Sequence, residues 1–132
     1  MAYTANAVGE AQITIRATDR FGATVDTTFK VTVANHQPTA SIVLSPDPPG
    51  TNATLTATAT GADQDGDAVN FTYVWKVNGT VVQTTPATTS VTDTLDLSQP
   101  TFGDTGDTIT VEVTPNDGTV NGALATATTI VA

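Results

Sequence analysis

Three aspartates alternate with other residues in the segment Asp63-Gln64-Asp65-Gly66-Asp67, and their carboxylates could bind a cation. Like charges this close repel one another unless a cation lies among them. Ca²⁺ takes several carboxylate and carbonyl oxygens in flexible geometry, so the spacing favours a calcium-binding loop. It is not an EF-hand, because the twelfth position from Asp63 is Val74 and not a glutamate. The alternative is a solvated turn, since Asp and Gly are ordinary turn residues.

Catalytic chemistry has little support in the sequence. The only histidine, His36, lies in an expected linker, and the chain has no cysteine. No spacing of Ser, His and Asp indicates nucleophilic catalysis, and carboxylates without a cleft favour cation binding over glycoside hydrolysis. We therefore expect that the chain is not an enzyme.

The composition restricts the class of partner. With 4 basic and 13 acidic residues the chain carries a net charge of −9, which argues against nucleic acid and against an anionic membrane surface. No apolar run is long enough for membrane insertion. The lack of cysteine, the low lysine content and the aspartate-rich turns together suggest a secreted bacterial module at an extracellular or cell-surface location.

Alternating apolar and polar residues at the start of the chain predict a β-hairpin with one apolar face. The turn is Asp19–Gly22, and the apolar residues are Ile13, Ile15, Ala17, Val25, Phe29, Val31 and Val33. An isolated hairpin is marginal in water, so we expect a neighbouring chain or the chain's own second domain to cover this face.

A second region, after the linker Asn35-His36-Gln37-Pro38, predicts an all-β, immunoglobulin-like sandwich of seven strands. The expected strands are 39–45, 53–60, 69–78, 80–85, 89–97, 107–114 and 123–131. Three inward faces should form the core: Phe71, Tyr73, Trp75 and Val77; Leu55, Ala57 and Ala59; and Ile109, Val111 and Val113. The expected domains are therefore 1–35 and 36–132.

The second domain resembles the PKD-like and cadherin-like modules of large bacterial surface proteins. The residues that carry this resemblance are the Asp63–Asp67 segment, Tyr73-Val74-Trp75, Asn78-Gly79 and the segment 111–118. The first 34 residues resemble the closing half of a dystroglycan-type cadherin-like module, through Gly9, Ala17-Thr18-Asp19, Gly22 and the segment 29–33. The resemblance implies a spacer or binding unit and a hairpin left from a partial module.

Sandwich topology predicts which residues complete the calcium site. The loops at 63–67 and 116–118 should lie at the end of the domain where the linker enters. The expected ligands are Asp63, Asp65, Asp67, Asp117, Glu10, Asn35 and Asn116, the two asparagines giving carbonyl oxygens. Asp104 and Asp107 should lie at the opposite end, either facing a following module or simply solvated.

The function expected from these features is structural or adhesive. The chain would be a Ca²⁺-stiffened spacer module of an extracellular bacterial surface, matrix or fibre protein, assembling with neighbouring modules or copies of itself by strand complementation. The alternative is a carbohydrate-binding module appended to a secreted protein, with glycans as partners. That class needs exposed aromatic side chains, and the candidates outside the expected core are Tyr3, Phe21 and Phe102.

Overall fold

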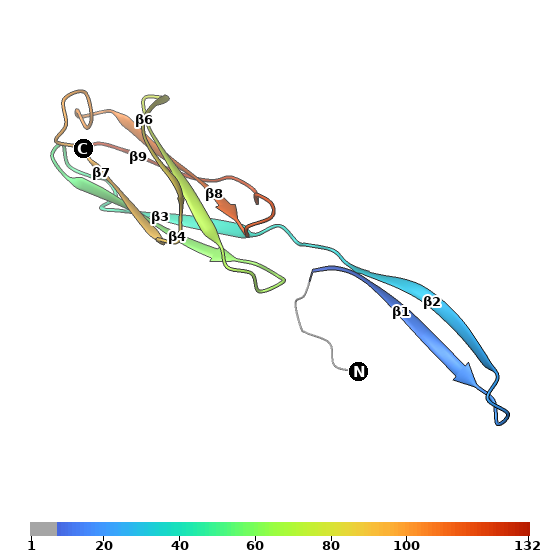
Figure 1. Ribbon diagram of the computed structural model, residues 1–132. Coiled ribbons are helices and arrows are strands. Elements are labelled where there is room, and N and C mark those ends of the chain that lie inside the picture. Colours follow the sequence, from blue (N-terminus) through green and yellow to red (C-terminus); the bar gives the residue numbers. More distant parts are fainter. Residues whose placement is uncertain (1–7) are drawn as a thin grey trace. The chain divides into compact units, whose positions relative to one another are not determined.

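The structure is a computed structural model that describes residues 8–132. The chain divides into two compact units, the first ending at His36 and the second running from Gln37 to Ala132. All regular structure in the described residues is β-strand (Figure 1). The strands are β1 (Gly9–Thr18), β2 (Thr24–Val33), β3 (Thr39–Ser45), β4 (Thr54–Ala62), β5 (Asn70–Val77), β6 (Thr80–Thr88), β7 (Thr92–Asp96), β8 (Thr108–Asn116) and β9 (Ala125–Ile130). None of the described residues belongs to a helix of the length and apolar character that crosses a bilayer.

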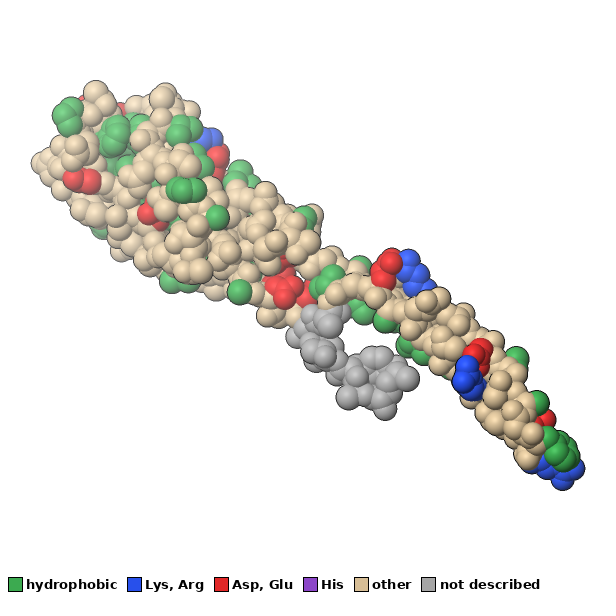
Figure 2. Space-filling view, in the orientation of Figure 1, with side chains coloured by type: hydrophobic (Ala, Val, Ile, Leu, Met, Phe, Trp, Pro, Cys, Tyr) green, Lys and Arg blue, Asp and Glu red, His purple; other side chains and the backbone are tan. Residues whose placement is uncertain are grey.

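The first unit is an antiparallel hairpin of β1 and β2 with two chemically different faces. Because directly opposite residues share a face, the register separates apolar from polar side chains. What we call the apolar face consists of Gly9, Ala11, Ile13, Ile15, Ala17, Val25, Thr27, Phe29, Val31 and Val33. The polar face carries two ion pairs, Arg16 Nε to Asp26 Oδ1 at 2.7 Å and Lys30 Nζ to Glu10 Oε1 at 2.6 Å. Figure 2 shows basic side chains beside acidic ones on the hairpin.

The second unit is a sandwich of two antiparallel sheets. One sheet has the order β3-β4-β7 and the other the order β6-β5-β8-β9. The chain changes sheet between β4 and β5, again between β6 and β7, and again between β7 and β8. These crossings place the β4–β5 loop and the β8–β9 loop at the same end of the sandwich (Figure 1).

The core lies between these sheets and contains every residue that the sequence placed on the three inward faces. Its largest members are Trp75 and Tyr73, both fully buried. The buried hydrophobic residues are Leu44, Leu55, Ala57, Ala59, Phe71, Tyr73, Trp75, Val77, Leu95, Leu97, Ile109, Val111, Val113 and Val131. The all-β sandwich, its seven strands and the inward register of Trp75 are therefore confirmed, with strand ends displaced by at most three residues.

Candidate metal site

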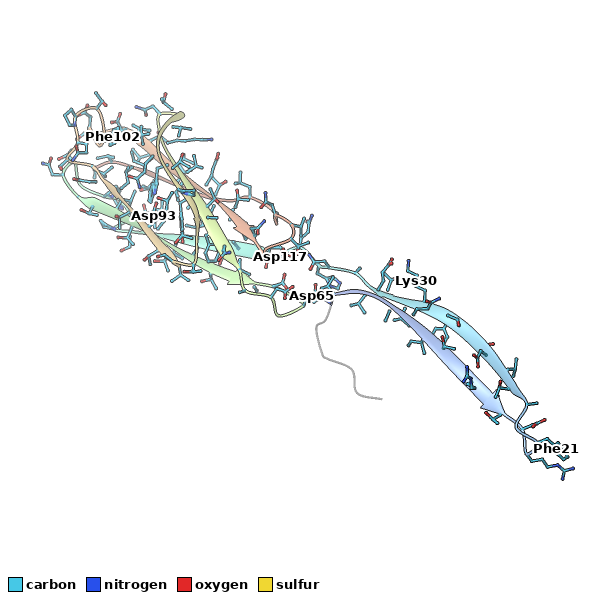
Figure 3. The ribbon with its side chains drawn as sticks, viewed as in Figure 1. Phe21, Lys30, Asp65, Asp93, Phe102 and Asp117 are labelled. Carbon is cyan, nitrogen blue, oxygen red and sulfur yellow. The ribbon has the colours of Figure 1, made fainter. Side chains whose placement is uncertain are left out.

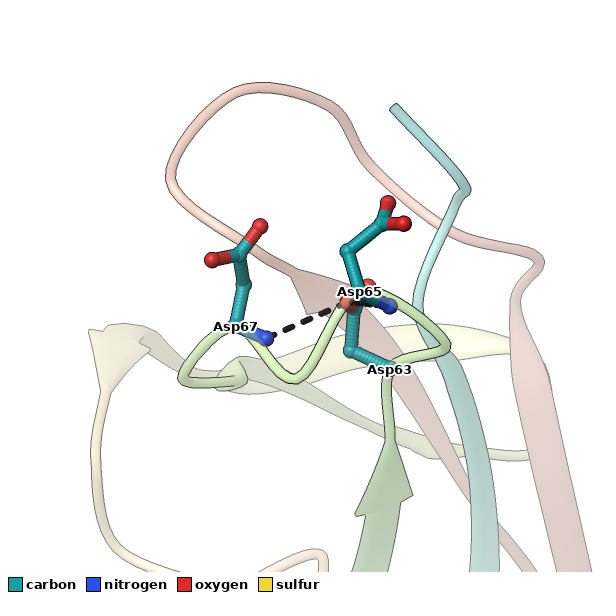
Figure 4. Close-up of side chains that lie close together, drawn as sticks. All are labelled: Asp63, Asp65 and Asp67. Atoms are coloured by element: carbon teal, nitrogen blue, oxygen red, sulfur yellow. Dashed lines mark hydrogen bonds between the residues drawn. The ribbon is translucent and has the colours of Figure 1, made fainter. Parts of the chain in front are cut away.

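The loop from β4 to β5 is organised by Asp63, which directly follows the last residue of β4. Its Oδ1 accepts hydrogen bonds from the backbone N–H of Asp65 at 2.8 Å and of Asp67 at 3.2 Å (Figure 4). Gly66 has a φ of 82°, a backbone conformation that L side chains rarely adopt. The aspartate and the glycine together hold a tight turn, which explains why this short polar segment has one defined conformation.

The same turn brings three carboxylates together. One carboxylate oxygen from each of Asp63, Asp65 and Asp67 lies within 4.8 Å of the others. At about 4 Å, two like charges repel by about 1 kcal/mol in bulk water and by about 4 kcal/mol near a protein surface. Asp65 is only 7% exposed, so solvent screens its charge poorly. A site of this kind is stabilised by a positive charge among the carboxylates.

One oxygen of the cluster lacks a partner. Asp63 Oδ2 is buried, and it is the one buried side-chain oxygen or nitrogen among residues 8–132 with no hydrogen bond. Leaving a buried polar atom unsatisfied costs about 1–3 kcal/mol, and more when the group is charged. Hard carboxylate oxygens in flexible geometry are the ligands that Ca²⁺ takes in proteins. The three side chains therefore fit a divalent cation.

Asn116 and Asp117 lie at the same end of the sandwich, but their polar atoms organise the β8–β9 loop. The register that pairs Asn70 with Asn116 places the end of β8 beside the start of β5 (Figure 3). Asn116 Oδ1 accepts from Gly118 N at 2.7 Å and its Nδ2 donates to Asn121 Oδ1 at 2.7 Å. Asp117 Oδ1 accepts two backbone hydrogen bonds of 2.7 Å within the same loop. Neither residue belongs to the three-aspartate cluster, and their part in a cation site stays a prediction.

Glu10 and Asn35 belong to the first unit. Glu10 forms an ion pair with Lys30 across the hairpin, which already neutralises its charge. The participation of Glu10 and Asn35 in the calcium site also stays a prediction.

The acidic turn at the opposite end of the sandwich ties two loops together. Asp107 Oδ1 accepts from Asn78 Nδ2 at 2.8 Å, and its Oδ2 accepts from the backbone N–H of Asp104 at 2.9 Å. Asn78 in return accepts from the N–H of Thr108 at 3.0 Å. Asp107 therefore has a structural role that joins the β5–β6 turn to the start of β8.

Sequence reasoning missed Asp93, which links the two sheets. Its Oδ2 accepts from Trp75 Nε1 at 2.8 Å, from Thr85 Oγ1 at 3.1 Å and from Gln83 Nε2 at 3.4 Å. β7 belongs to one sheet and the three donors to the other. Burial, and secondarily the negative charge of Asp93, raises the pKa of Tyr73. The alternation of β7 could have revealed this residue, because Asp93 is in phase with the inward-pointing Leu95.

Of the three aromatic residues proposed for glycan binding, two lie in the described residues, one in each unit. Tyr3 lies outside residues 8–132. Phe21, at the hairpin tip, is 80% exposed, and the Arg20 guanidinium lies 4.5 Å from its ring centroid. Phe102 lies outside the buried core, as expected, but it is only partly exposed. The turn in which Phe102 N bonds to Gln99 O folds its side chain back, partly buried, against the core (Figure 3).

Comparisons with known proteins show the fold. No protein-family model matches the sequence, and no curated protein is significantly similar to it. Among solved structures, domains d3–d4 of the rat CD45 extracellular region match with a TM-score of 0.56 and 12% identity, over 98% of this chain and 68% of that one. The fibronectin(III)-like modules of CbhA from Clostridium thermocellum match with a TM-score of 0.49 and 19% identity, over 95% and 63%. The likeness to the CD45 domains shows an immunoglobulin-like β-sandwich.

Proposed function

We propose that the chain is a structural or adhesive module of an extracellular bacterial surface, matrix or fibre protein, and that Asp63, Asp65 and Asp67 hold a stiffening Ca²⁺. The observation that carries the proposal is the buried, unpartnered oxygen of Asp63 inside a cluster of three carboxylates. Two features support the module class: the fold is that of an extracellular region of CD45, and the marks of the PKD-like and cadherin-like modules lie on the sandwich.

The position of the cluster explains how a cation would stiffen the module. β3, the first strand of the sandwich, pairs with β4 so that Thr39 lies opposite Ala62. Thr39 Oγ1 also donates to the Ala62 carbonyl at 3.3 Å. Asp63 is the next residue, so the carboxylates lie beside the point where the chain enters the sandwich. Fixing the β4–β5 loop there would limit motion of the entering strand, which is the property that a load-bearing spacer requires.

The proposal predicts that Ca²⁺ raises the melting temperature of the chain. A ligand that binds only the folded state stabilises it by mass action, by about 2.7 kcal/mol when its concentration is a hundredfold above Kd. For a domain of this size such a gain corresponds to a rise of roughly 10 °C or more. The measurement is thermal unfolding followed by circular dichroism in EGTA and in millimolar Ca²⁺.

Two variants and one control make this experiment specific. Asp65→Asn and Asp67→Asn should each reduce the rise, because each removes one anionic ligand, and Asp67 is exposed so that its packing cost is small. Thr110→Ser is the control: it keeps the hydroxyl that bonds to Thr128 at 3.1 Å and should leave the rise unchanged. Identical melting curves in EGTA and in Ca²⁺ would contradict the proposal that the aspartates bind Ca²⁺.

A further inference from the structure

The loop between β5 and β6, which is not part of the proposed cation site, joins an asparagine directly to a glycine. Asn78 has a φ of 50° and Gly79 a φ of 84°, the two positive values that a type I′ hairpin turn requires. Both residues are exposed, so water reaches the loop. No atom lies within 4 Å of the place that a Cβ of Gly79 would take, so the Asn78 side chain has room to approach the Gly79 nitrogen.

An asparagine followed by an unhindered glycine can undergo deamidation, a reaction of the chain with its own side chain. The backbone nitrogen of Gly79 attacks Cγ of Asn78, its proton passes to solvent, and the side-chain nitrogen leaves as ammonia. The succinimide ring formed in this way is opened by water at either of its carbonyls. The product is aspartate, or isoaspartate, in which the main chain runs through the side-chain carbons. The overall reaction consumes water and releases ammonia.

In the folded chain the side-chain amide of Asn78 is bound at both of its polar atoms. Its Nδ2 donates to Asp107 Oδ1 at 2.8 Å, and its Oδ1 accepts from the N–H of Thr108 at 3.0 Å. Asp107 is itself fixed, because its Oδ2 accepts from the N–H of Asp104 at 2.9 Å. Since ring closure expels Nδ2, the reaction has to break the hydrogen bond to Asp107. This contact therefore opposes deamidation as long as it is formed.

We propose that Asn78-Gly79 is a site of spontaneous covalent modification, and that the Asp107 carboxylate keeps it unreacted until the contact between them opens. The aspartate product carries a second carboxylate where the amide donated to Asp107, so the two side chains repel each other. The isoaspartate product lengthens the main chain of a two-residue loop, which disturbs the pairing of Val77 with Thr80. Either product therefore releases the β5–β6 turn from β8, and the released amide is not restored.

The chain contains a second asparagine–glycine pair, Asn121-Gly122, which is held by different contacts. The N–H of Gly122, whose nitrogen would be the nucleophile, donates to the Pro115 carbonyl at 2.8 Å. The Asn121 side chain accepts from Asn116 Nδ2 at 2.7 Å. None of these contacts involves Asp107. This pair therefore responds to unfolding of the sandwich but not to the loss of the Asp107 carboxylate, and it serves as an internal control.

Peptide mapping by mass spectrometry, on the whole chain incubated in mildly alkaline buffer, tests the proposal by following conversion at both pairs. Asp107→Ala should speed conversion at Asn78 about tenfold or more, the factor by which losing a hydrogen bond to a charged group favours the released side chain. Asp107→Asn keeps an oxygen that can accept from Asn78 Nδ2 and should retain most of the protection. Conversion at Asn121 should stay as in the wild type in both variants.

The two pairs keep the test decisive even where Asp107→Ala weakens the whole sandwich, because general unfolding speeds both of them. An unchanged rate at Asn78, or equal acceleration at Asn78 and Asn121, would overturn the proposal. The consequence of the reaction is measured with Asn78→Asp, which has the side chain of the aspartate product and should melt at a lower temperature than the wild type. The charge-matched control is Asn121→Asp, whose side chain can still accept from Asn116. An equal effect of these two substitutions on the melting temperature would also overturn the proposal.

Discussion

Replacing Trp75 with alanine should destabilise the sandwich by about 3–5 kcal/mol, the usual cost of emptying a large aromatic site in a core. Trp75 is fully buried and its side chain is among the largest in the core. Its indole N–H also donates to Asp93 at 2.8 Å, so the substitution removes one of the bonds between the two sheets. A loss of this size is a large part of the 5–15 kcal/mol by which a domain is normally stable.

Urea unfolding of the wild type and the variant, followed by circular dichroism, measures this loss. The matched control is Val74→Ala on the same strand, because Val74 points away from the core and is only half-buried. We expect the control to cost less than half as much as Trp75→Ala. The wild type should also emit blue-shifted tryptophan fluorescence that moves to the red on unfolding. Native emission at the solvent-exposed position would contradict the buried site.

The strands and the core could be predicted from the sequence because their pattern is local. Phe71, Tyr73, Trp75 and Val77 alternate with polar residues, and a period of two places them on one face whatever the partners are. The end of β6 was predicted too early, at residue 85, directly before Pro86. β6 is an edge strand, where a proline is tolerated, and it continues to Thr88.

The candidate site could be predicted only where it is local. Asp63, Asp65 and Asp67 come together because one turn holds them, and the turn chemistry is visible in the sequence. The hydrogen bonds by which Asn116 and Asp117 organise the loop 116–121 could not be predicted, because they depend on the conformation of the loop. The link from Asp93 to Trp75 depends on which strands face each other across the sandwich, which no single segment specifies.

The close packing of the backbone around Gly122 could not be predicted from the sequence either. Substitution of Gly122 should nevertheless lower the stability of the sandwich substantially. A Cβ at Gly122 would lie 1.8 Å from the carbonyl oxygen of Pro38 and 3.0 Å from Pro115 Cγ. Both prolines are fully buried, and the Gly122 N–H donates to the Pro115 carbonyl at 2.8 Å. A side chain at Gly122 would therefore clash with the backbone of Pro38. If the β8–β9 loop moved away to relieve the clash, the hydrogen bond from Gly122 N–H to the Pro115 carbonyl would be lost.

Gly122→Ala should accordingly cost about 2–3 kcal/mol, in the upper part of the usual cost of overpacking, because backbone cannot give way as a flexible side chain can. The matched control is Gly50→Ala. Neither glycine has a positive φ, but a Cβ at Gly50 meets no atom within 4 Å, so the two substitutions differ in the available space. Urea unfolding monitored by Trp75 fluorescence should show a clearly lower midpoint for Gly122→Ala and little change for Gly50→Ala. Equal midpoints for the two variants would show that the β8–β9 loop does not pack against Pro38 as closely as the structure has it.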